Sequence, residues 1–293
     1  MLVGFGTRVV LDNVVRPFVE NEGGKFWNPQ LKGGYHVEPF EQSIWPGFDM
    51  NEFLKEKNDV AVFGILRGTE NWLYKCKQLG LNYYYFDHAY FFKAHGHKRN
   101  HISDIQSYRI TKNGENLNKI VELNDEDRNR IQKYKQFKET FRLKDIRKGK
   151  DILIIPPTEA VCRYYKITDL DRWIRKTKEK IRKFTDRSIN IRYKTDTRPL
   201  DEDLHKAHCV VTFQSTVGIT AILKGIPVIC NDVSMCKPVS IKYDDIEKEY
   251  IRDNDLVNKW IDSLLANQFS MIEIQDGTAK RIVDKYDNNT QTS

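Results

Sequence analysis

The sequence predicts a two-domain α/β protein with a parallel sheet in each domain. Its 293 residues exceed the usual length of one domain, so two hydrophobic cores are expected. In both halves of the chain, short apolar segments alternate with amphipathic segments of helical length, which is the pattern of βαβ units. The charged stretch 144–150 separates the halves. We therefore predict two Rossmann-like domains, residues 1–148 and 149–293, that face each other across a cleft.

The elements of the first half are clearest after residue 59. Residues 1–50 are rich in glycine and aromatic residues, which indicates turns and short strands without helical periodicity. Farther on, Gly80 ends a predicted helix between two apolar strands, and Asn124 or Asp125 caps a polar helix. The predicted strands are 60–66 and 81–86, the predicted helices are 69–79 and 124–143, and residues 88–114 are loop-like.

The second half repeats the same alternation. Two prolines, Pro156 and Pro157, end its first strand, and Gly225 closes a helix that leads into the last strand. The predicted strands are 151–157, 189–194, 209–213 and 227–230, and the predicted helices are 169–184, 201–206, 215–224 and 255–266. Four strands interleaved with helices indicate a Rossmann-like domain. Residues 287–293 are expected to fray.

The composition indicates a globular protein of the cytoplasm. A mean hydropathy of -0.62 and 30% charged residues describe a well-solvated exterior. We find neither an apolar run of about 20 residues nor a secretory leader. The five cysteines are odd in number and form no C-x-x-C pair, which favours reduced thiols. A net charge of +7 favours polyanionic partners, although charge runs also mark ordinary solvated helix faces.

The most informative segment is 210–228. A buried strand leads to small hydroxyl side chains at the first turn of a helix, where backbone N–H groups and the helix dipole attract phosphate. A Gly-Ile-Pro-Val exit then turns the chain into the next strand, so the helix start lies at the carboxyl edge of the sheet. We predict an anion site here; an ordinary βαβ turn without a ligand is the alternative.

Residues 214–228 read Gln-Ser-Thr-x-Gly-x-x-Ala-x-x-x-Gly-Ile-Pro-Val, which resembles the nucleotide-sugar motif of glycosyltransferase B folds. Segments 63–68, 84–91, 151–160 and 192–204 are similar to phage-encoded and capsular-polysaccharide members. The resemblance covers most of residues 60–230. It implies transfer of a sugar, UDP-glucose being the expected donor, with no tightly bound cofactor and no required divalent metal. Phage members are expected to glycosylate 5-hydroxymethylcytosine or a related hydroxymethylated pyrimidine in DNA.

The resemblance also implies a set of donor-binding residues. Ser215 and Thr216 would hold the diphosphate, Thr158 would face the same cleft, and Arg192 or Lys194 would neutralise the leaving phosphate. The full donor set is Thr158, Arg192, Lys194, Gln214, Ser215, Thr216, Gly218 and Thr220. Thr220 stands where many relatives carry a glutamate for the ribose, so the mode of ribose binding stays open.

Sugar transfer to a hydroxyl needs a base, and Asp87-His88 is the candidate. Both residues follow a buried strand, so their side chains should emerge at the carboxyl end of a sheet. Either Asp87 or His88 could take the proton. A structural interpretation is equally open, in which Asp87 caps a turn and His88 orients it.

For the acceptor we predict contacts from Arg67, Tyr90, His95 and His97. The histidines also suggest a metal site, but neighbouring lysine and arginine residues suit a phosphate backbone better. The resemblance to phage members implies double-stranded DNA as the partner, with aromatic side chains stacking an extruded base. Two alternatives remain: a polysaccharide or lipid-linked acceptor, and a basic nucleic-acid-binding protein without catalysis.

Overall fold

The chain divides into two compact units, called unit 1 and unit 2. Unit 1 comprises Met1–Glu115 and Leu265–Ser293, and unit 2 comprises Asn116–Leu264. Within them, the computed structural model describes residues 1–6, 9–27, 53, 56–66, 68–93, 105–146 and 148–287. The two units are described separately below.

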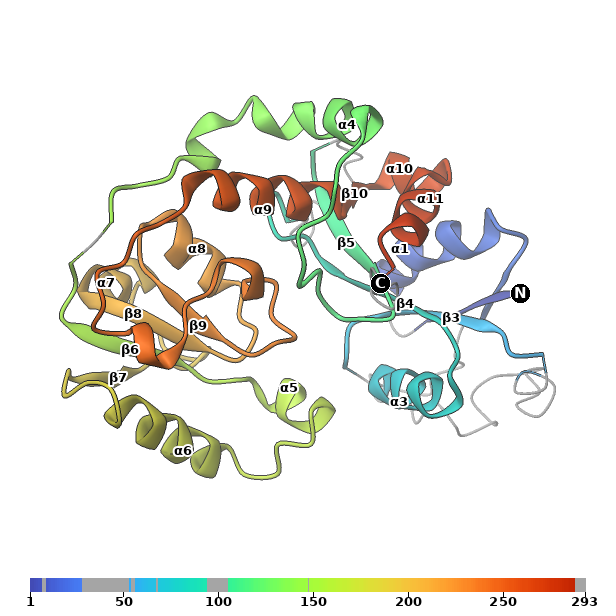
Figure 1. Ribbon diagram of the computed structural model, residues 1–293. Coiled ribbons are helices and arrows are strands. Elements are labelled where there is room, and N and C mark those ends of the chain that lie inside the picture. Colours follow the sequence, from blue (N-terminus) through green and yellow to red (C-terminus); the bar gives the residue numbers. More distant parts are fainter. Residues whose placement is uncertain are drawn as a thin grey trace. The chain divides into compact units, whose positions relative to one another are not determined.

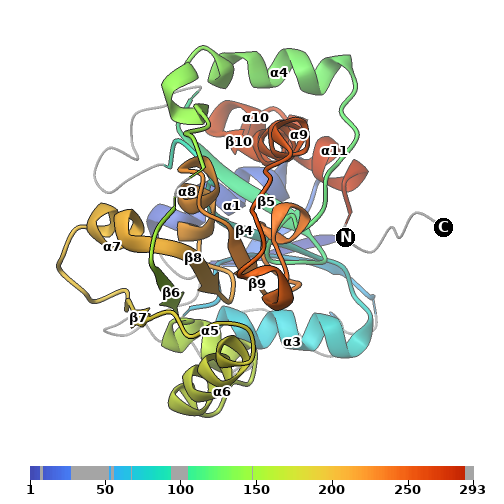
Figure 2. The same cartoon turned by 60° about the vertical axis from the view of Figure 1, so that its left-hand side comes forward.

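Unit 1 contains a six-stranded sheet in the order β10-β5-β4-β3-β1-β2. In chain order its elements are β1 (Leu2–Phe5), α1 (Val9–Glu20), β2 (Lys25–Trp27), β3 (Asp59–Phe63), α3 (Thr69–Leu79), β4 (Tyr83–His88), β5 (Ser107–Lys112), β10 (Gln268–Ser270), α10 (Met271–Gln275) and α11 (Thr278–Lys285). Strands β2, β1, β3 and β4 are parallel, whereas β5 is antiparallel to both β4 and β10. Figures 1 and 2 show α3 on one face of this sheet and α1, α10 and α11 on the other.

The predicted β3-α3-β4 unit is confirmed. Helix α3 spans the predicted residues and ends at Gly80, whose backbone is left-handed with φ 67°. A glycine adopts this conformation without the steric cost that a Cβ atom brings. By contrast, the prediction of turns and short strands for the first fifty residues was wrong for α1. Its buried Val14, Val15 and Phe18 show that the helix packs by one face, even though it contains Pro17.

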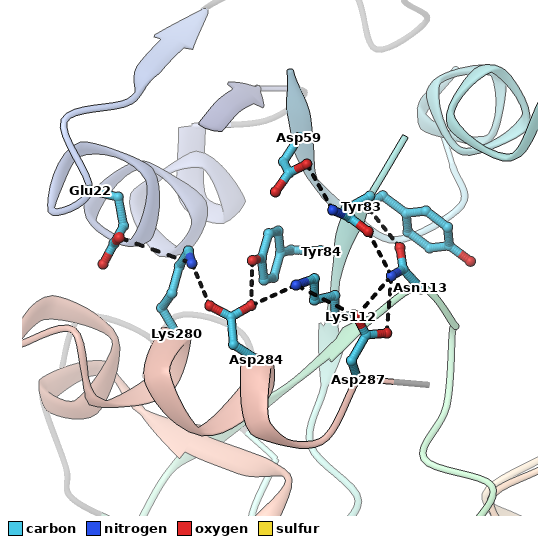
Figure 3. A network of polar contacts seen from close by, with 10 residues as sticks. Glu22, Asp59, Tyr83, Tyr84, Lys112, Asn113, Lys280, Asp284 and Asp287 are labelled. Atoms are coloured by element: carbon cyan, nitrogen blue, oxygen red, sulfur yellow. Dashed lines mark hydrogen bonds and ion pairs between the residues drawn. The ribbon is translucent and has the colours of Figure 1, made fainter. Parts of the chain in front are cut away.

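A polar network, here called the C-terminal clasp, attaches α11 to the edge of the sheet where β3 and β4 begin (Figure 3). Asp284 accepts hydrogen bonds from the Tyr84 hydroxyl at 2.5 Å, from Lys112 Nζ at 3.0 Å and from Lys280 Nζ at 2.5 Å. Asp287 accepts bonds from Asn113 Nδ2 at 3.0 and 3.1 Å. Helix α11 is thereby attached to the sheet of unit 1.

Unit 2 contains a fully parallel four-stranded sheet in the order β7-β6-β8-β9. In chain order its elements are α4 (Asp125–Lys135), a 3-10 helix (Lys138–Phe141), β6 (Asp151–Ile155), α5 (Glu159–Tyr164), α6 (Leu170–Arg182), β7 (Ile189–Ile191), α7 (Leu200–Lys206), β8 (Ala207–Thr212), α8 (Val217–Leu223), β9 (Val228–Cys230), 3-10 helices at Lys237–Val239 and Tyr243–Asp245, and α9 (Asn254–Ala266). Figures 1 and 2 show α5 and α6 on one face of the sheet and α8 and α9 on the other.

The predicted strands and helices of unit 2 are found, with ends that differ by a few residues, except that the predicted helix 124–143 is divided into α4 and a 3-10 helix. Asn124 caps α4 in a capping box with Asp127, and Asp169 caps α6 by accepting the Arg172 N–H. Both caps supply an acceptor for backbone N–H groups that the helix itself leaves unsatisfied. None of the helices in the described part of the chain combines the length and the apolar character needed to cross a membrane.

The units divide the chain at positions that differ from the predicted boundary at 148/149. One reason is β10, which returns to the first sheet and pairs with β5. The other is the segment before β6, which is hydrogen-bonded within unit 2: the Lys144 N–H donates to the Leu223 carbonyl, and the Val121 N–H donates to Ser263 Oγ. The charged stretch 144–150 is thus a connection inside unit 2.

Candidate functional site

The sheet of unit 2 has a topological switch point between β6 and β8. From β6 the chain continues to β7 on one side of it, and then returns to β8 and β9 on the other side. The loops that leave β6 and β8 therefore diverge to opposite faces of the sheet. In open parallel sheets, ligands bind at the carboxyl ends of the strands at such a point.

Strand register brings two of the predicted donor segments together at this switch point. Ile155, the last residue of β6, is paired with Thr212, the last residue of β8. Thr158 and Ser215 each follow three residues later, so they leave neighbouring parallel strands at the same edge. The Thr212 hydroxyl also donates to the Ile155 carbonyl at 3.1 Å, which joins the two strand ends. We call this region, residues 156–158 and 213–216, the switch-point edge.

Gln214 occupies the centre of the polar contacts at the switch-point edge. Its Oε1 atom accepts hydrogen bonds from Asn116 Nδ2 at 3.1 Å and from the Tyr165 hydroxyl at 3.2 Å. Asn116 Nδ2 also donates to the Val233 carbonyl, in the loop after β9. Both bonds use the same oxygen, so the amide is oriented with its Nε2 group directed away from these partners. Within the described residues, Nε2 itself has no hydrogen-bond partner.

Sequence reasoning missed Asn116 and Tyr165. Asn116 lies 98 residues before Gln214 in the sequence, and no motif connects the two. Tyr165 follows α5, and its ring packs against Phe213 with ring centroids 4.9 Å apart. The one signal in the sequence was the residue type of Tyr165, because a tyrosine hydroxyl can form a hydrogen bond.

The start of α8 satisfies several of its own backbone donors. The Ser215 N–H donates to Thr212 Oγ1, and the Val217 N–H donates to Ser215 Oγ. The N–H groups of Gly218 and Ile219 donate to the carbonyls of Ser215 and Thr216. A helix start holds an anion through N–H groups that lack partners. The predicted role of backbone donors in holding a diphosphate is therefore weakened here, and the side chains become the stronger candidates.

Two other predicted donor residues lie within α8. Gly218 is buried, and a Cβ atom at this position would come 2.8 Å from Cys236 Sγ. Its glycine is thus explained by close packing. Thr220 is half-buried in the middle of the helix, away from the loop that carries Ser215.

The predicted phosphate cations differ in their availability. Arg192 follows β7, but its guanidinium contacts Asp203 at 2.5 Å and donates to the Arg198 carbonyl at 2.7 Å. Arg198 binds the same carboxylate at 2.8 Å. Lys194, in contrast, is exposed and has no ion pair with any carboxylate in the described residues. Of the two predicted cations, Lys194 is the one that remains available to a ligand.

In unit 1, Asp87 belongs to a buried polar cluster at the end of β4. Arg109 lies opposite it on β5 and contacts its carboxylate at 2.6 Å. The Tyr85 hydroxyl donates to the same oxygen at 2.9 Å, and the His88 N–H donates to the other oxygen at 2.7 Å. Burial raises the pKa of Asp87, but the Arg109 guanidinium and these hydrogen bonds outweigh it, so the pKa lies below its usual value.

His88 is the last residue of β4 and is half-buried, with its ring 5.8 Å from the Phe63 ring in an edge arrangement. Tyr90, a predicted acceptor contact, is 4% exposed and lies beside the Arg109 guanidinium at 5.3 Å. Its ring is thus part of the unit 1 core, as are the rings of Tyr84 and Tyr85. The other predicted acceptor contacts, Arg67, His95 and His97, lie outside the described residues.

Comparison with known proteins identifies the fold. Neither a protein-family model nor a curated protein sequence matches the chain. Among solved structures, it is similar to Thermosulfurimonas dismutans KpsC, beta Kdo 2,7 transferase, with 11% sequence identity and a TM-score of 0.50 over 96% of this chain and 99% of that chain. It is also similar to Thermosulfurimonas dismutans KpsC, beta Kdo 2,4 transferase, with 12% identity and a TM-score of 0.48 over 97% and 98%. The predicted fold class, α/β with two sheets rich in parallel strands, is confirmed.

Proposed function

We propose that this protein is a glycosyltransferase that binds a nucleotide-sugar donor at the switch-point edge of unit 2. The observation that carries the proposal is the register of β6 and β8, which brings Thr158 and Ser215 to one edge at the topological switch point. The similarity of the fold to a solved sugar transferase supports it. Because one fold hosts many functions, the site itself has to be tested.

Side chains provide the donor contacts in this proposal. Gln214 Nε2 and the Thr158 hydroxyl have no hydrogen-bond partner within the described residues, so they are available to phosphate or sugar oxygens. The Ser215 hydroxyl accepts from the Val217 N–H and keeps its own proton for donation. Lys194 is the exposed cation that would balance the charge of the leaving nucleotide.

We propose a polysaccharide or lipid-linked glycan as the acceptor, with an acidic sugar such as Kdo transferred from its CMP donor. The solved structure of similar fold is described as a Kdo transferase, and this favours CMP-Kdo over UDP-glucose. None of the comparisons supports hydroxymethylated DNA as the acceptor. The DNA acceptor therefore gives way to the alternative.

His88 is the proposed base in place of Asp87. The Asp87 carboxylate is neutralised by Arg109 and already accepts three hydrogen bonds, so it is a weak proton acceptor. His88 follows it as the last residue of β4, and imidazole is the side chain that most often serves as a general base in enzymes.

Isothermal calorimetry with CMP and with UDP tests the donor site. We expect one nucleotide to bind, and we expect Gln214→Ala to weaken its affinity by about threefold to tenfold, the loss that follows from one hydrogen bond. Gln132→Ala, on the exposed side of α4, is the matched control and should leave the affinity unchanged.

Absence of binding to both nucleotides would refute the proposal and favour a non-catalytic protein. If a nucleotide binds, the acceptor can be identified by mass spectrometry after incubation with CMP-Kdo or UDP-glucose. The reaction is offered either a Kdo-bearing glycan or hydroxymethylated DNA. Modification of the DNA alone would restore the original prediction.

A further inference from the structure

The solvent-facing side of α6 carries a dense run of positive charge. Between Arg163 and Lys183 the sequence contains nine lysine and arginine residues against three aspartate and glutamate residues. This short segment thus has a net charge of +6, while the whole chain has +7. The remaining 272 residues are nearly neutral. The basic character of the protein is therefore a local property of α6 and its flanks.

Five of these cations form what we call the cationic face of α6. Its members are exposed and have no ion pair with a carboxylate in the described part of the chain: Arg172, Arg175, Lys176, Lys178 and Lys183. Some other arginines of unit 2 are paired, for example the half-buried Arg187 with Glu247 at 2.7 Å. Like charges one helical turn apart repel one another, so an unpaired face of this kind is stabilised by binding an anion.

The opposite side of α6 is already used for packing. Ile174 and Ile181 are buried, and Ile181 belongs to the core cluster that includes Ile152 and Val211 of the sheet. An amphipathic helix binds a bilayer by burying its apolar side among the acyl chains. Since the apolar side of α6 faces the sheet, only the charged side is presented outward, and a soluble polyanion fits this surface better than a membrane does.

The direction of α6 relates this surface to the switch-point edge. Strands β6 and β7 are parallel, so the segment between them begins at the carboxyl edge of the sheet and returns to the amino edge. Tyr165, which contacts Gln214, lies just before α6. The helix has 13 residues and extends about 20 Å away from that edge at roughly 1.5 Å per residue.

We propose that the cationic face of α6 binds the acceptor itself, as a carboxylate-bearing glycan chain that lies along the helix. In this arrangement the growing end of the chain is near the switch-point edge, and the preceding acidic sugars contact Arg172, Lys176 and Lys183 in turn. The proposal rests on the function proposed above. It adds the class of acceptor and the surface that holds it.

Fluorescence anisotropy with labelled polysialic acid, a carboxylate-bearing glycan, tests this surface in the full-length protein. The test variant is Arg172→Gln, Arg175→Gln, Lys176→Gln and Lys183→Gln; glutamine is a good helix former, so α6 should persist. The control removes the same four charges elsewhere in unit 2: Arg128→Gln, Lys138→Gln, Lys144→Gln and Lys148→Gln. Circular dichroism establishes that both variants are folded.

We expect wild-type binding that weakens with added salt, and a loss of affinity of about tenfold or more in the α6 variant but not in the control. Neutral dextran should not bind. Equal affinity of the α6 variant and the wild type would overturn the proposal. Binding only to duplex DNA, or only to anionic phosphatidylglycerol vesicles, would also overturn it. Calorimetry with CMP and UDP is a separate readout, so loss of nucleotide binding with an intact glycan response would refute the donor site alone.

Discussion

Asp87 and Arg109 form an ion pair whose partners face each other across β4 and β5. The side chain of Arg109 is 9% exposed and that of Asp87 is 27% exposed, so little water is available to replace either partner. Removing one member of a buried pair leaves the other charge uncompensated, which costs far more than the pair itself contributes. Asp87 therefore acts mainly on the stability of unit 1.

We predict that Asp87→Asn destabilises the protein by roughly 3 to 5 kcal/mol, because the Arg109 guanidinium is left buried without a carboxylate. Scanning calorimetry measures the effect. The pKa of Asp87 is lowered in the folded state, so its stabilisation is complete above the ordinary aspartate pKa and is lost as the pH falls through the lower, folded value. The stability of the Asp87→Asn variant should lack this acid-sensitive contribution.

Two variants serve as controls for this prediction. Asp245→Asn removes a carboxylate whose partner, Lys248, is largely exposed, and it should change stability much less. His88→Gln should leave stability near the wild-type value while it lowers turnover by about a hundredfold, the scale of lost general-base catalysis. A stable Asp87→Asn protein with greatly reduced turnover would contradict this assignment and return Asp87 to the role of base.

The pattern of residue types predicted which side chains lie at the end of a strand. It did not predict which of their charges are neutralised by an ion pair. Asp87 and Arg192 were sound candidates by position, since both follow strands. Their partners, Arg109 and Asp203, come from an antiparallel strand and from α7. Such pairs depend on register and loop path, which no spacing in the sequence reveals.

At the scale of elements, the C-terminal clasp attaches α11 through a few shared polar atoms. Asp284 accepts hydrogen bonds from Tyr84 on β4, from Lys112 on β5 and from Lys280 on α11 itself. Burial raises the pKa of Asp284, but these three donors together lower it below the usual value. Burial and the neighbouring Asp284 raise the pKa of Tyr84, which therefore remains a hydrogen-bond donor.

We predict that Asp284→Asn weakens the attachment of α11 by about 1 to 2 kcal/mol, a figure reduced for its partial exposure. Because its pKa is lowered, the clasp should be complete above the ordinary aspartate pKa and should weaken as the pH falls through the folded value. Native-state hydrogen exchange of backbone amides measures the local opening of α11 directly, and α3 serves as an internal reference.

Glu22→Gln is the comparison variant for the clasp. The side chain of Glu22 is 42% exposed, and its carboxylate is as far as 4.0 Å from Lys280 Nζ. Hydrogen exchange in α11 should therefore barely change in this variant. Faster exchange across the whole of unit 1 in Asp284→Asn, with α11 and α3 affected equally, would show that α11 has no separate opening and would refute a local clasp.

Helices α3, α4 and α6, whose ends carry capping or stop residues, were predicted, whereas α1 was missed. Asn124 and Asp169 cap α4 and α6, and Gly80 ends α3, as the sequence indicated. Helix α1 was missed because it is rich in valine and contains Pro17, both of which disfavour an isolated helix. Its formation is explained by packing of Val14, Val15, Phe18 and Val19 in the core, a tertiary contribution that local propensity does not contain.

At the scale of the whole molecule, the chain leaves unit 1 after Glu115 and returns to it at Leu265. The return is fixed by β10 and by Asn267 Nδ2, which donates to the Ile110 carbonyl 157 residues earlier in the sequence. The alternation of strands and helices predicted two sheets, but the pairing of a three-residue strand at the edge of the first sheet has no sequence pattern of its own.

We predict that residues 116–264, prepared as a separate fragment, fold cooperatively, whereas residues 149–293 do not. The first fragment retains the pair Lys135–Asp262, the bond from Val121 to Ser263 and the contacts of Asn116 with Gln214. The second fragment loses all three and carries β10, α10 and α11 without the sheet to which they belong, so apolar side chains such as Phe269 and Ile282 would be exposed to water.

Near-ultraviolet circular dichroism and thermal unfolding distinguish the two outcomes. Nucleotide binding by the first fragment, with the affinity of the full chain, would restrict the donor site to unit 2. Cooperative unfolding of residues 149–293 would instead support a domain boundary at 148/149.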